Sequence, residues 1–281
     1  MNNAGTLTLI PTSGLGNRLR IIVASIKLAR KSGKKLVIYW YKNDELYAKH
    51  DELFDFPENI TIREIPLKYK IWMSMRRYSS KIFGLDKYYL RLFKFDFVFF
   101  DSMAGLIWHN KMDIQKEVDK AKNVFVCSCQ ELHYSDLADY QLLKPKPGIQ
   151  KKIDDVVMQF KPGIIGIHIR STDNAKSLEK SPFHVFIKKI EEELNANPQA
   201  TFFLATDNPD YQNQLLQQFG CDKILFLEKE FRREVSQGVM DAVADLYCLA
   251  NTSKIYGSYY SSFSAEAGRI GQIQVEILKV S

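Results

Sequence analysis

Short apolar runs alternate along the chain with segments in which apolar residues recur at helical spacing. Thr6 to Ile10 is a run of the first kind, and Asn17 to Arg30 is a segment of the second kind. Gly163 to Ile169 is a continuous apolar run of the type that is buried in a parallel sheet. The same patterns predict strands at 36–40, 60–65, 95–100, 123–128, 201–205, 223–227, 254–257 and 273–277, and helices at 149–160, from 182 onward, and at 209–219, 238–250 and 263–270. Strands that alternate with helices indicate an α/β protein with mainly parallel sheets.

The clearest interruption of this pattern is Lys144 to Gly148, where two prolines and a glycine break regular structure. A chain of 281 residues fits about two domains of roughly 150 residues each. We therefore predict an N-terminal α/β domain at 1–146 and a C-terminal α/β domain at 147–281. Open parallel sheets bind ligands at the carboxyl ends of their strands, so the loops at those ends are the candidates for function.

Composition narrows the class of protein. Hydrophobic residues make up 46% of the chain and charged residues 26%, which excludes a collagen, a coiled coil and an extensively disordered protein. No stretch approaches the roughly 20 apolar residues of a membrane helix, and the N-terminus lacks the features of a secretory signal. The four cysteines include no CxxC pair, so we expect reduced, mostly buried thiols and a cytoplasmic location. Association with the inner face of the membrane stays open.

The net charge of +6 suits an anionic ligand or a membrane-adjacent role, and it is too small for a nucleic-acid footprint. Basic residues cluster between Lys68 and Lys94, where they are interleaved with tyrosines and a tryptophan. Amphipathic helices with a solvated basic side are the favoured interpretation of this segment. A glycan platform, a lipid-surface patch and an RNA face stay open as alternatives.

The sequence Gly-Leu-Gly-Asn-Arg at 14–18 joins the first predicted strand to the first predicted helix. Gly14 and Gly16 let the backbone approach a ligand closely, and a helix N-terminus attracts anions. Arg18 and Arg20 add positive charge there. A dinucleotide fingerprint would need a third glycine where Leu19 stands, so a nicotinamide cofactor is not favoured. A tight turn without chemical importance accounts for these residues equally well.

The sequence His-Ile-Arg-Ser-Thr-Asp at 168–173 ends the apolar run. Strand geometry puts His168 and Arg170 on the same face, with Asp173 just beyond them. A guanidinium is suited to bidentate recognition of phosphate. The structural alternative is a simple ion pair between Arg170 and Asp173.

Three further segments carry polar residues for which a functional and a structural role are both open. Asp207 follows a strand, where it would accept hydrogen bonds from a sugar or a base, or else cap the next helix. Ser261 and Ser262 precede a helix and form either a phosphate cradle or an ordinary cap. Asp241 and Asp245 share one helix face, and for such a pair solvation at the surface is the default.

Several motifs of other chemistries are missing from the chain. It contains no GxxxxGK[ST] loop, no HExxH, no GxSxG and no Asp-x-Asp sequence. Metal-dependent nucleotide-sugar chemistry is therefore disfavoured.

The order and spacing of the candidate segments are specific when they are taken together. Gly-Leu-Gly-Asn-Arg at 14–18, His-Ile-Arg-Ser-Thr-Asp at 168–173, Ala-Thr-Asp-Asn-Pro at 205–209, and Asp245 followed by Ser-Ser-Phe-Ser at 261–264 resemble the GDP-fucose-dependent fucosyltransferases. The likeness is greatest to the nodulation-type α-1,6-fucosyltransferases, which are related to protein O-fucosyltransferases. Residues 68–122 show no recognisable match.

The resemblance implies the GT-B architecture, in which two Rossmann-like domains with mainly parallel sheets face a cleft. It implies that the C-terminal domain binds the donor and that the N-terminal domain receives a glycan acceptor. Arg170 would hold the donor diphosphate, Asp245 would accept from guanine N1–H and N2–H₂, and Asn17 would face the reacting centre. The donor-binding residues expected from the motifs are His168, Arg170, Asp173, Asp207, Asp245, Ser261 and Ser262.

The expected reaction is inverting, metal-independent transfer of fucose from GDP-fucose to a glycan hydroxyl, without a cofactor or a nucleic-acid partner. Arg170 and the serine loop would stabilise the leaving diphosphate. Ser171 stands where relatives carry a second basic residue, and Glu179 aligns loosely with the carboxylate proposed there as acceptor base. Another nucleotide sugar, a non-catalytic nucleotide- or glycan-binding module and nucleic-acid binding through 68–94 stay open, as do the acceptor, the linkage and the oligomeric state.

Overall fold

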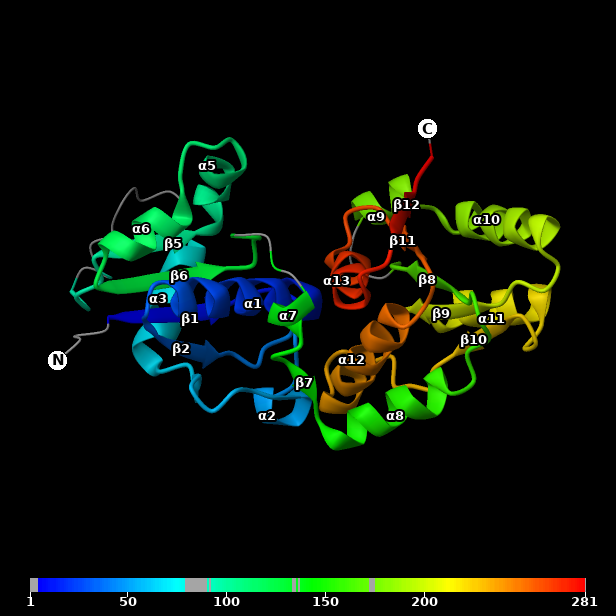
Figure 1. The fold of residues 1–281 in the computed structure, drawn as a ribbon, viewed down its shortest axis with the longest axis horizontal. Coiled ribbons are helices and arrows are strands. Elements are labelled where there is room, and N and C mark those ends of the chain that lie inside the picture. The colour runs from blue at the N-terminus through cyan, green and yellow to red at the C-terminus, as the bar shows by residue number, and fades with distance from the viewer. Residues whose placement is uncertain are drawn as a thin grey trace. The chain divides into compact units, whose positions relative to one another are not determined.

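The computed structural model describes residues 5–78, 90, 92–132, 135, 137–171 and 175–280, and it comprises two compact units (Figure 1). The first unit contains Met1–Glu45 and Phe56–Leu143, and the second contains Leu46–Asp55 and Lys144–Ser281. The segment 46–55 thus lies in the second unit, although the predicted division assigned residues 1–146 to the first.

A small antiparallel ribbon ties the segment 46–55 to the second unit. β3 (Phe54–Asp55) pairs with β7 (Lys144–Pro145). α2 (His50–Leu53) packs on helix α12 (Ser236–Ala250) of the same unit, and Ser236 Oγ donates to Tyr47 O at 3.1 Å. These pairings are long-range in sequence, so no local pattern predicts them.

A five-stranded parallel sheet forms the centre of the first unit, in the order β4-β2-β1-β6-β5. The strands have four to six residues, and β1, β2, β5 and β6 are mainly apolar, as the sequence pattern predicts. The elements of this unit are β1 (Thr6–Pro11), α1 (Leu15–Lys31), β2 (Lys35–Trp40), β4 (Thr61–Glu64), α3 (Leu67–Tyr78), β5 (Phe97–Phe100), the 3₁₀ turn η1 (Asp101–Met103), α5 (Ala104–Trp108), α6 (Ile114–Lys120), β6 (Asn123–Ser128) and α7 (Leu137–Tyr140).

Aromatic side chains fill the core between α3 and the first sheet. The ring centroids of Tyr69 and Trp72 lie 5.5 and 5.3 Å from that of Phe125 on β6. Lys68 and Lys70 on the same helix are exposed. Over residues 67–74 the basic segment is thus the predicted amphipathic helix, whereas 79–89 and 91 lie outside the described residues.

The second unit also contains a five-stranded parallel sheet, in the order β10-β9-β8-β11-β12. Its elements, besides α2, β3 and β7, are α8 (Pro147–Val157), β8 (Ile165–Ile169), α9 (Ala175–Lys180), α10 (Phe183–Ala196), β9 (Phe202–Thr206), α11 (Pro209–Phe219), β10 (Ile224–Phe226), α12 (Ser236–Ala250), β11 (Ile255–Ser258), α13 (Ser262–Gly271) and β12 (Val275–Leu278).

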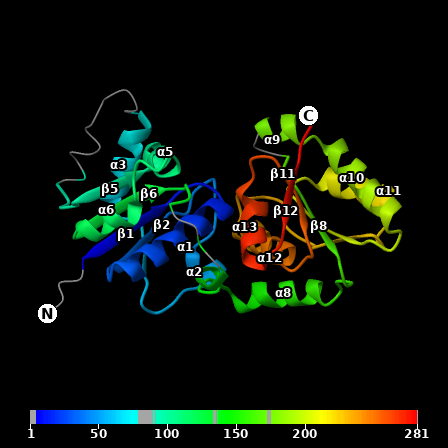
Figure 2. The ribbon, with the colours of Figure 1, turned by 45° about the horizontal axis from the view of Figure 1, so that its top comes forward.

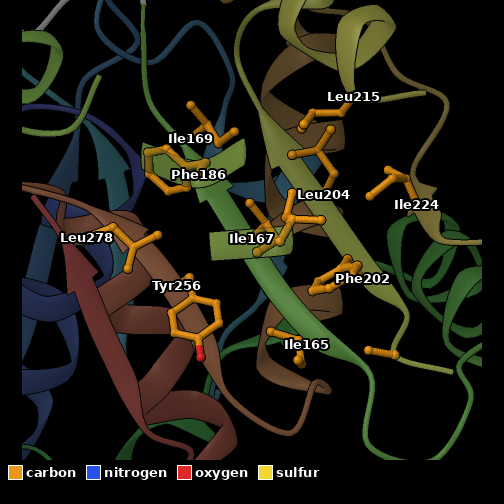
Figure 3. Packing of buried hydrophobic residues seen from close by; sticks show 12 residues of the cluster. Ile165, Ile167, Ile169, Phe186, Phe202, Leu204, Leu215, Ile224, Tyr256 and Leu278 are labelled. Atoms are coloured by element: carbon orange, nitrogen blue, oxygen red, sulfur yellow. The ribbon is translucent and has the colours of Figure 1, made fainter. Parts of the chain in front are cut away.

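The two faces of the second sheet are covered by different helices (Figure 2). Ile165, Ile167 and Ile169 alternate along β8 and pack with Phe186 of α10 and Leu215 of α11 on one face (Figure 3). On the other face α12 approaches closely, since a Cβ on Gly166 would lie 3.0 Å from Leu249 Cδ2 of that helix and 2.8 Å from Thr252 Oγ1 just beyond its end. The alternation therefore directs His168 away from the core of α10 and α11.

The strand order of the second sheet reverses between β8 and β11. The chain moves from β8 outward to β9 and β10, and then returns to the opposite side of β8 as β11 and β12. In open parallel sheets the carboxyl ends of the two strands at such a reversal form the usual ligand site. Arg170 follows β8, and Ser258 ends β11, at this position.

The predicted fold class, α/β with two mainly parallel sheets in Rossmann-like units, is confirmed. The segment 170–181 contains the helix α9, which the sequence pattern did not predict. The sequence pattern also missed α2, α5, α6 and α7, which have at most seven residues each.

Candidate functional site

The candidate site lies at the carboxyl edge of the second sheet, where β8 and β11 end beside each other. The Arg170 backbone N–H donates to Ser258 Oγ at 2.9 Å. That hydroxyl in turn donates to the His168 carbonyl at 3.2 Å. The two bonds fix the backbone from which the half-buried Arg170 side chain leaves the strand.

His168 is a buried, neutral histidine. Its ring stacks on Phe263 of α13, with the ring centroids 4.9 Å apart and the planes inclined by 21°. Burial lowers the pKa of His168 to about 3, because the imidazolium would lose its hydration. Within the described residues Nδ1 has no hydrogen-bond partner, so the ring can offer this nitrogen to a ligand.

Asp207 is held by the protein on both carboxylate oxygens. Oδ1 accepts from Ser171 N at 2.8 Å and from Ser171 Oγ at 3.3 Å, and Oδ2 accepts from Arg233. The helix cap that was the alternative role for Asp207 is provided by Asn208, whose Oδ1 accepts from Asp210 N at 2.8 Å. Asp207 therefore anchors the backbone that follows Arg170.

The N-terminus of α13 lies at the same edge of the sheet. Ser261 is the helix cap, and its Oγ accepts from Phe263 N at 3.3 Å. Ser262 is half-exposed, and its hydroxyl has no hydrogen-bond partner in the part of the chain that the structure describes. Ser262 and the first N–H groups of this ten-residue helix favour a bound anion, whereas the hydroxyl of Ser261 is used as a cap.

Asp241 and Asp245 are both buried, so the expectation of a solvated pair is wrong. The carboxylate of Asp241 is fully partnered by Lys152, by Gln237 Nε2 at 2.9 Å and by Glu230 N at 2.9 Å. Asp245 has one partner, because Oδ2 accepts from Lys229 while the buried Oδ1 has none among the described residues. A buried carboxylate oxygen without a donor is costly, by about 1–3 kcal/mol, so Oδ1 is a candidate contact for a ligand.

Burial also changes the acidity of Asp245. It raises the pKa of this carboxyl to about 6, against the opposing effect of the Lys229 ammonium. The like charge of Asp241 acts in the same direction as burial. At neutral pH the carboxylate is therefore ionised and able to accept two further hydrogen bonds at Oδ1.

Lys229 and Arg233 are further residues of the site that were not predicted from the sequence. Both lie in the irregular segment 227–235, which follows β10 and therefore emerges at the carboxyl edge of the sheet. Lys229 pairs with Asp245 and Arg233 pairs with Asp207. The available signal was the alternating charge of 228–234, in a loop at the edge where ligands bind.

In the first unit the predicted glycine turn leads into α1, and Gly14 is the helix cap. Asn17 Nδ2 donates to Ser13 Oγ at 2.9 Å, and Ser13 N donates to Glu45 Oε2 at 3.2 Å. Gly16, the second glycine of the turn, is buried in the first turn of the helix. These contacts hold Asn17 at the carboxyl edge of the first sheet.

The expectation that Arg18 adds charge for a ligand is wrong. Arg18 is 1% exposed, and its guanidinium donates to Ser13 O, Tyr41 O and Asn43 Oδ1 at 2.6–2.7 Å. Burial lowers its pKa to about 10, which leaves it charged at neutral pH. Arg18 therefore joins the glycine turn to the loop after β2.

We expect Arg18→Met to lower the free energy of unfolding by about 2–4 kcal/mol, because it removes three hydrogen bonds of a buried guanidinium and leaves the half-buried carbonyls of Ser13 and Tyr41 without this donor. Arg30→Met is the control on the same helix, since Arg30 is largely exposed and its partner Asp139 keeps Lys27. Urea denaturation measures both losses. A loss for Arg18→Met no larger than that for Arg30→Met would contradict the structural role of Arg18.

The remaining predicted site residues have the following positions. Glu179 is exposed on α9, which Val280 N holds to the carboxyl end of β12 through Lys180 O at 2.8 Å. Asp173 lies outside the described residues. The four cysteines are free thiols, of which Cys221 is exposed.

Two features are absent from the described part of the chain. No helix in it is long and apolar enough to cross a membrane. Its histidines, cysteines and carboxylates form no group of three or more that is placed to hold a metal ion.

The fold and the edge site define an α/β protein of two Rossmann-like units, with a candidate anion-binding site in the second. No protein-family model matches the sequence, and no curated protein sequence matches it. Solved structures do match. NodZ α-1,6-fucosyltransferase soaked with GDP-fucose superposes with a TM-score of 0.62 at 17% identity, over 95% of this chain and 92% of that one.

Two further matches belong to the same class. A mutant of Arabidopsis thaliana FUT1 in complex with GDP has a TM-score of 0.61 at 13% identity, over 98% of this chain and 70% of that one. POFUT1 in its apo form has a TM-score of 0.58 at 10% identity, over 100% of this chain and 99% of that one. The likeness to fucosyltransferases that the motifs predicted is thereby confirmed at the level of the fold.

Proposed function

We propose that this protein is a glycosyltransferase that transfers fucose from GDP-fucose to a hydroxyl of a glycan. The observation that carries the proposal is the edge of the second sheet, where Arg170 and the N-terminus of α13 flank the strand reversal and Asp245 keeps an open oxygen. Structures with the same fold contain GDP or GDP-fucose and are named fucosyltransferases.

In this proposal the diphosphate of the donor binds between Arg170 and the N-terminus of α13. The guanidinium forms charge-assisted hydrogen bonds to phosphate oxygens, and Ser262 and nearby backbone N–H groups add further donors. Ser258 holds the N–H of Arg170 and the carbonyl of His168, and Asp207 holds the N–H of Ser171, so the backbone on both sides of Arg170 is fixed. Asp173, the last residue of the His-Ile-Arg-Ser-Thr-Asp motif, belongs to the donor site in this proposal as well.

The reaction we propose is a single inverting displacement. The acceptor oxygen attacks the anomeric carbon of fucose as the bond to the β-phosphate oxygen breaks, and the acceptor proton passes to a carboxylate, for which Glu179 is the candidate. Negative charge develops on the departing diphosphate, where Arg170 stabilises it without a metal ion. The role of Asn17 at the reacting centre stays a prediction of the resemblance.

Asp245 is proposed to recognise the guanine base. Guanine presents N1–H and N2–H₂ as neighbouring donors, and an ionised carboxylate accepts from both. Asp241, one turn earlier on α12, has no free oxygen for this purpose within the described structure.

We expect the affinity for GDP-fucose to fall about tenfold between pH 7.5 and pH 5, because Asp245, with its pKa of about 6, becomes protonated over that range. The ionised carboxylate, which is the form that accepts from guanine, predominates above about pH 6 and is lost below it. His168, with a pKa of about 3, stays neutral throughout. The sugar diphosphate is the suitable ligand, since the terminal phosphate of free GDP itself titrates near pH 6. Constant affinity across this range would show that Asp245 does not contact the base.

Titration calorimetry with GDP-fucose, GDP-mannose and UDP-glucose in the presence of EDTA tests the donor assignment. We expect micromolar binding of GDP-fucose and weaker binding of the other two. Preference for another donor would indicate a different nucleotide sugar, and tight GDP binding without donor hydrolysis or transfer would indicate a non-catalytic module. No binding of any donor would refute the proposal.

A further inference from the structure

Lys229 occupies an unusual position for a lysine. Its side chain is 4% exposed, and it forms an ion pair with Asp245, whose side chain is 6% exposed. The ammonium also lies 5.3 Å from the centroid of the Phe231 ring. Lysine is almost never fully buried unless it is paired, because its strongly hydrated ammonium is costly to remove from water.

The hydrogen-bonding capacity of this pair is not used up. An ammonium has three N–H donors, and within the described residues Lys229 has one hydrogen-bond acceptor, Asp245 Oδ2. Asp245 Oδ1 is buried without a donor. The pair therefore combines unused donors on the lysine with an unused acceptor on the aspartate.

A second lysine–aspartate pair, formed by Lys152 of α8 and Asp241 of α12, does not share this unused hydrogen-bonding capacity. Lys152 is 42% exposed, so water can reach its ammonium, and both oxygens of Asp241 have donors within the described residues. Asp241 and Asp245 lie one helical turn apart on α12, and each is paired with a lysine. Only the pair of Lys229 and Asp245 offers both a donor and an acceptor to a ligand.

We propose that Lys229 is a specificity-determining residue that donates a hydrogen bond to O6 of guanine while Asp245 accepts from N1–H and N2–H₂. This inference deepens the proposed function and rests on it. Guanine carries an acceptor directly beside two donors on one edge, which complements the ammonium and the carboxylate in the same order. Adenine carries an amino group in place of O6 and an acceptor at N1, so both contacts would become repulsive.

Access to the pair requires movement of the segment 227–235. Both side chains are almost fully covered, and the segment that carries Lys229 is irregular throughout. A shift of the segment would break no strand or helix, but it would break the bonds from Glu230 N to Asp241 and from Arg233 to Asp207. A base that reaches Asp245 would then be enclosed together with Lys229, where a charge-assisted hydrogen bond is strong.

The test compares GDP with 6-thio-GDP by titration calorimetry at neutral pH. Sulfur is a weak hydrogen-bond acceptor, so we expect the wild-type protein to bind 6-thio-GDP about tenfold less tightly than GDP. Lys229→Met should bind GDP at least about tenfold less tightly and should show no difference between GDP and 6-thio-GDP. Lys152→Met is the matched control and should keep the discrimination of the wild type.

Inosine diphosphate separates the two residues of the pair. It keeps O6 and N1–H but lacks the amino group, so its loss of affinity relative to GDP belongs to Asp245 and should persist in Lys229→Met. Thermal unfolding shows whether Lys229→Met is folded. If it is not, the affinities of the wild type for GDP and for 6-thio-GDP still test the role of Lys229.

Equal affinity of the wild type for GDP and 6-thio-GDP would overturn the role of Lys229 and leave the proposed function intact. Undiminished discrimination in folded Lys229→Met would do the same. Failure of the wild type to bind GDP at all would overturn the proposed function, and the role of Lys229 with it.

Discussion

Arg170→Ala is expected to lower the rate of GDP-fucose turnover about 10²–10³-fold, which is the usual effect of removing a group that stabilises developing negative charge. It should also weaken binding of the donor, because each charge-assisted hydrogen bond contributes about 1.5–3 kcal/mol. The fold should be retained, since Ser258 and Asp207 hold the backbone around residue 170 through bonds that do not involve its side chain. Donor hydrolysis, followed as released GDP, measures turnover without a known acceptor.

Arg170→Lys and Arg232→Ala complete this experiment. Lysine keeps the charge but not the planar fork, so an intermediate loss would indicate that the guanidinium binds the diphosphate through two bonds. Arg232 is 70% exposed and pairs with its neighbour Glu230, so Arg232→Ala should keep donor turnover. Turnover and affinity unaffected by Arg170→Ala would show that the diphosphate binds elsewhere.

Elements with complete local signals were predicted well from the sequence. α11 has the predicted bounds, Pro209–Phe219, because Asn208 caps it, Pro209 suits its first turn, and Gly220 ends it with φ +84°. The buried strands of both sheets were found for a similar reason, since a continuous apolar run of strand length within an α/β pattern is typical of a strand that is covered on both faces.

Elements that depend on distant partners were not predicted. β3 and β7 have two residues each and exist only because they pair with each other across about 90 residues of chain. α9 is a single polar segment without apolar periodicity, and such a segment cannot be distinguished from a loop by its pattern. The association of 46–55 with the second unit follows from the pairing of β3 with β7 and carries no local signature.

The candidate site was predicted in part. The positions of Arg170, Ser261 and Ser262 follow from strand and helix ends, which local patterns predict well. The burial of Asp241 and Asp245 does not follow from their spacing, because two carboxylates on one helix face are usually solvated. What buries them is the approach of α8, which carries Lys152, and of the loop with Lys229, and neither is visible in the sequence of α12.

Asp245→Asn should weaken binding of GDP-fucose by a factor on the order of 10³, because it removes charge-assisted hydrogen bonds worth about 1.5–3 kcal/mol each and turns an amide N–H₂ toward the donors of guanine. The pH dependence of the affinity should disappear in the same variant, since its cause is the titration of Asp245. Calorimetry at pH 7.5 and pH 5 measures both effects.

Asp241→Asn is the matched control for this substitution. Asp241 lies on the same helix, is equally buried and is also paired with a lysine, so its replacement costs stability through similar contacts. Its oxygens face protein donors only, and we expect folded Asp241→Asn to bind GDP-fucose close to the level of the wild type. Equal losses of affinity in the two variants would mean that both act through the packing of α12, and the open oxygen of Asp245 would then not be the contact to the base. A loss confined to Asp245→Asn, together with the missing pH dependence, is the result that a base-reading carboxylate requires.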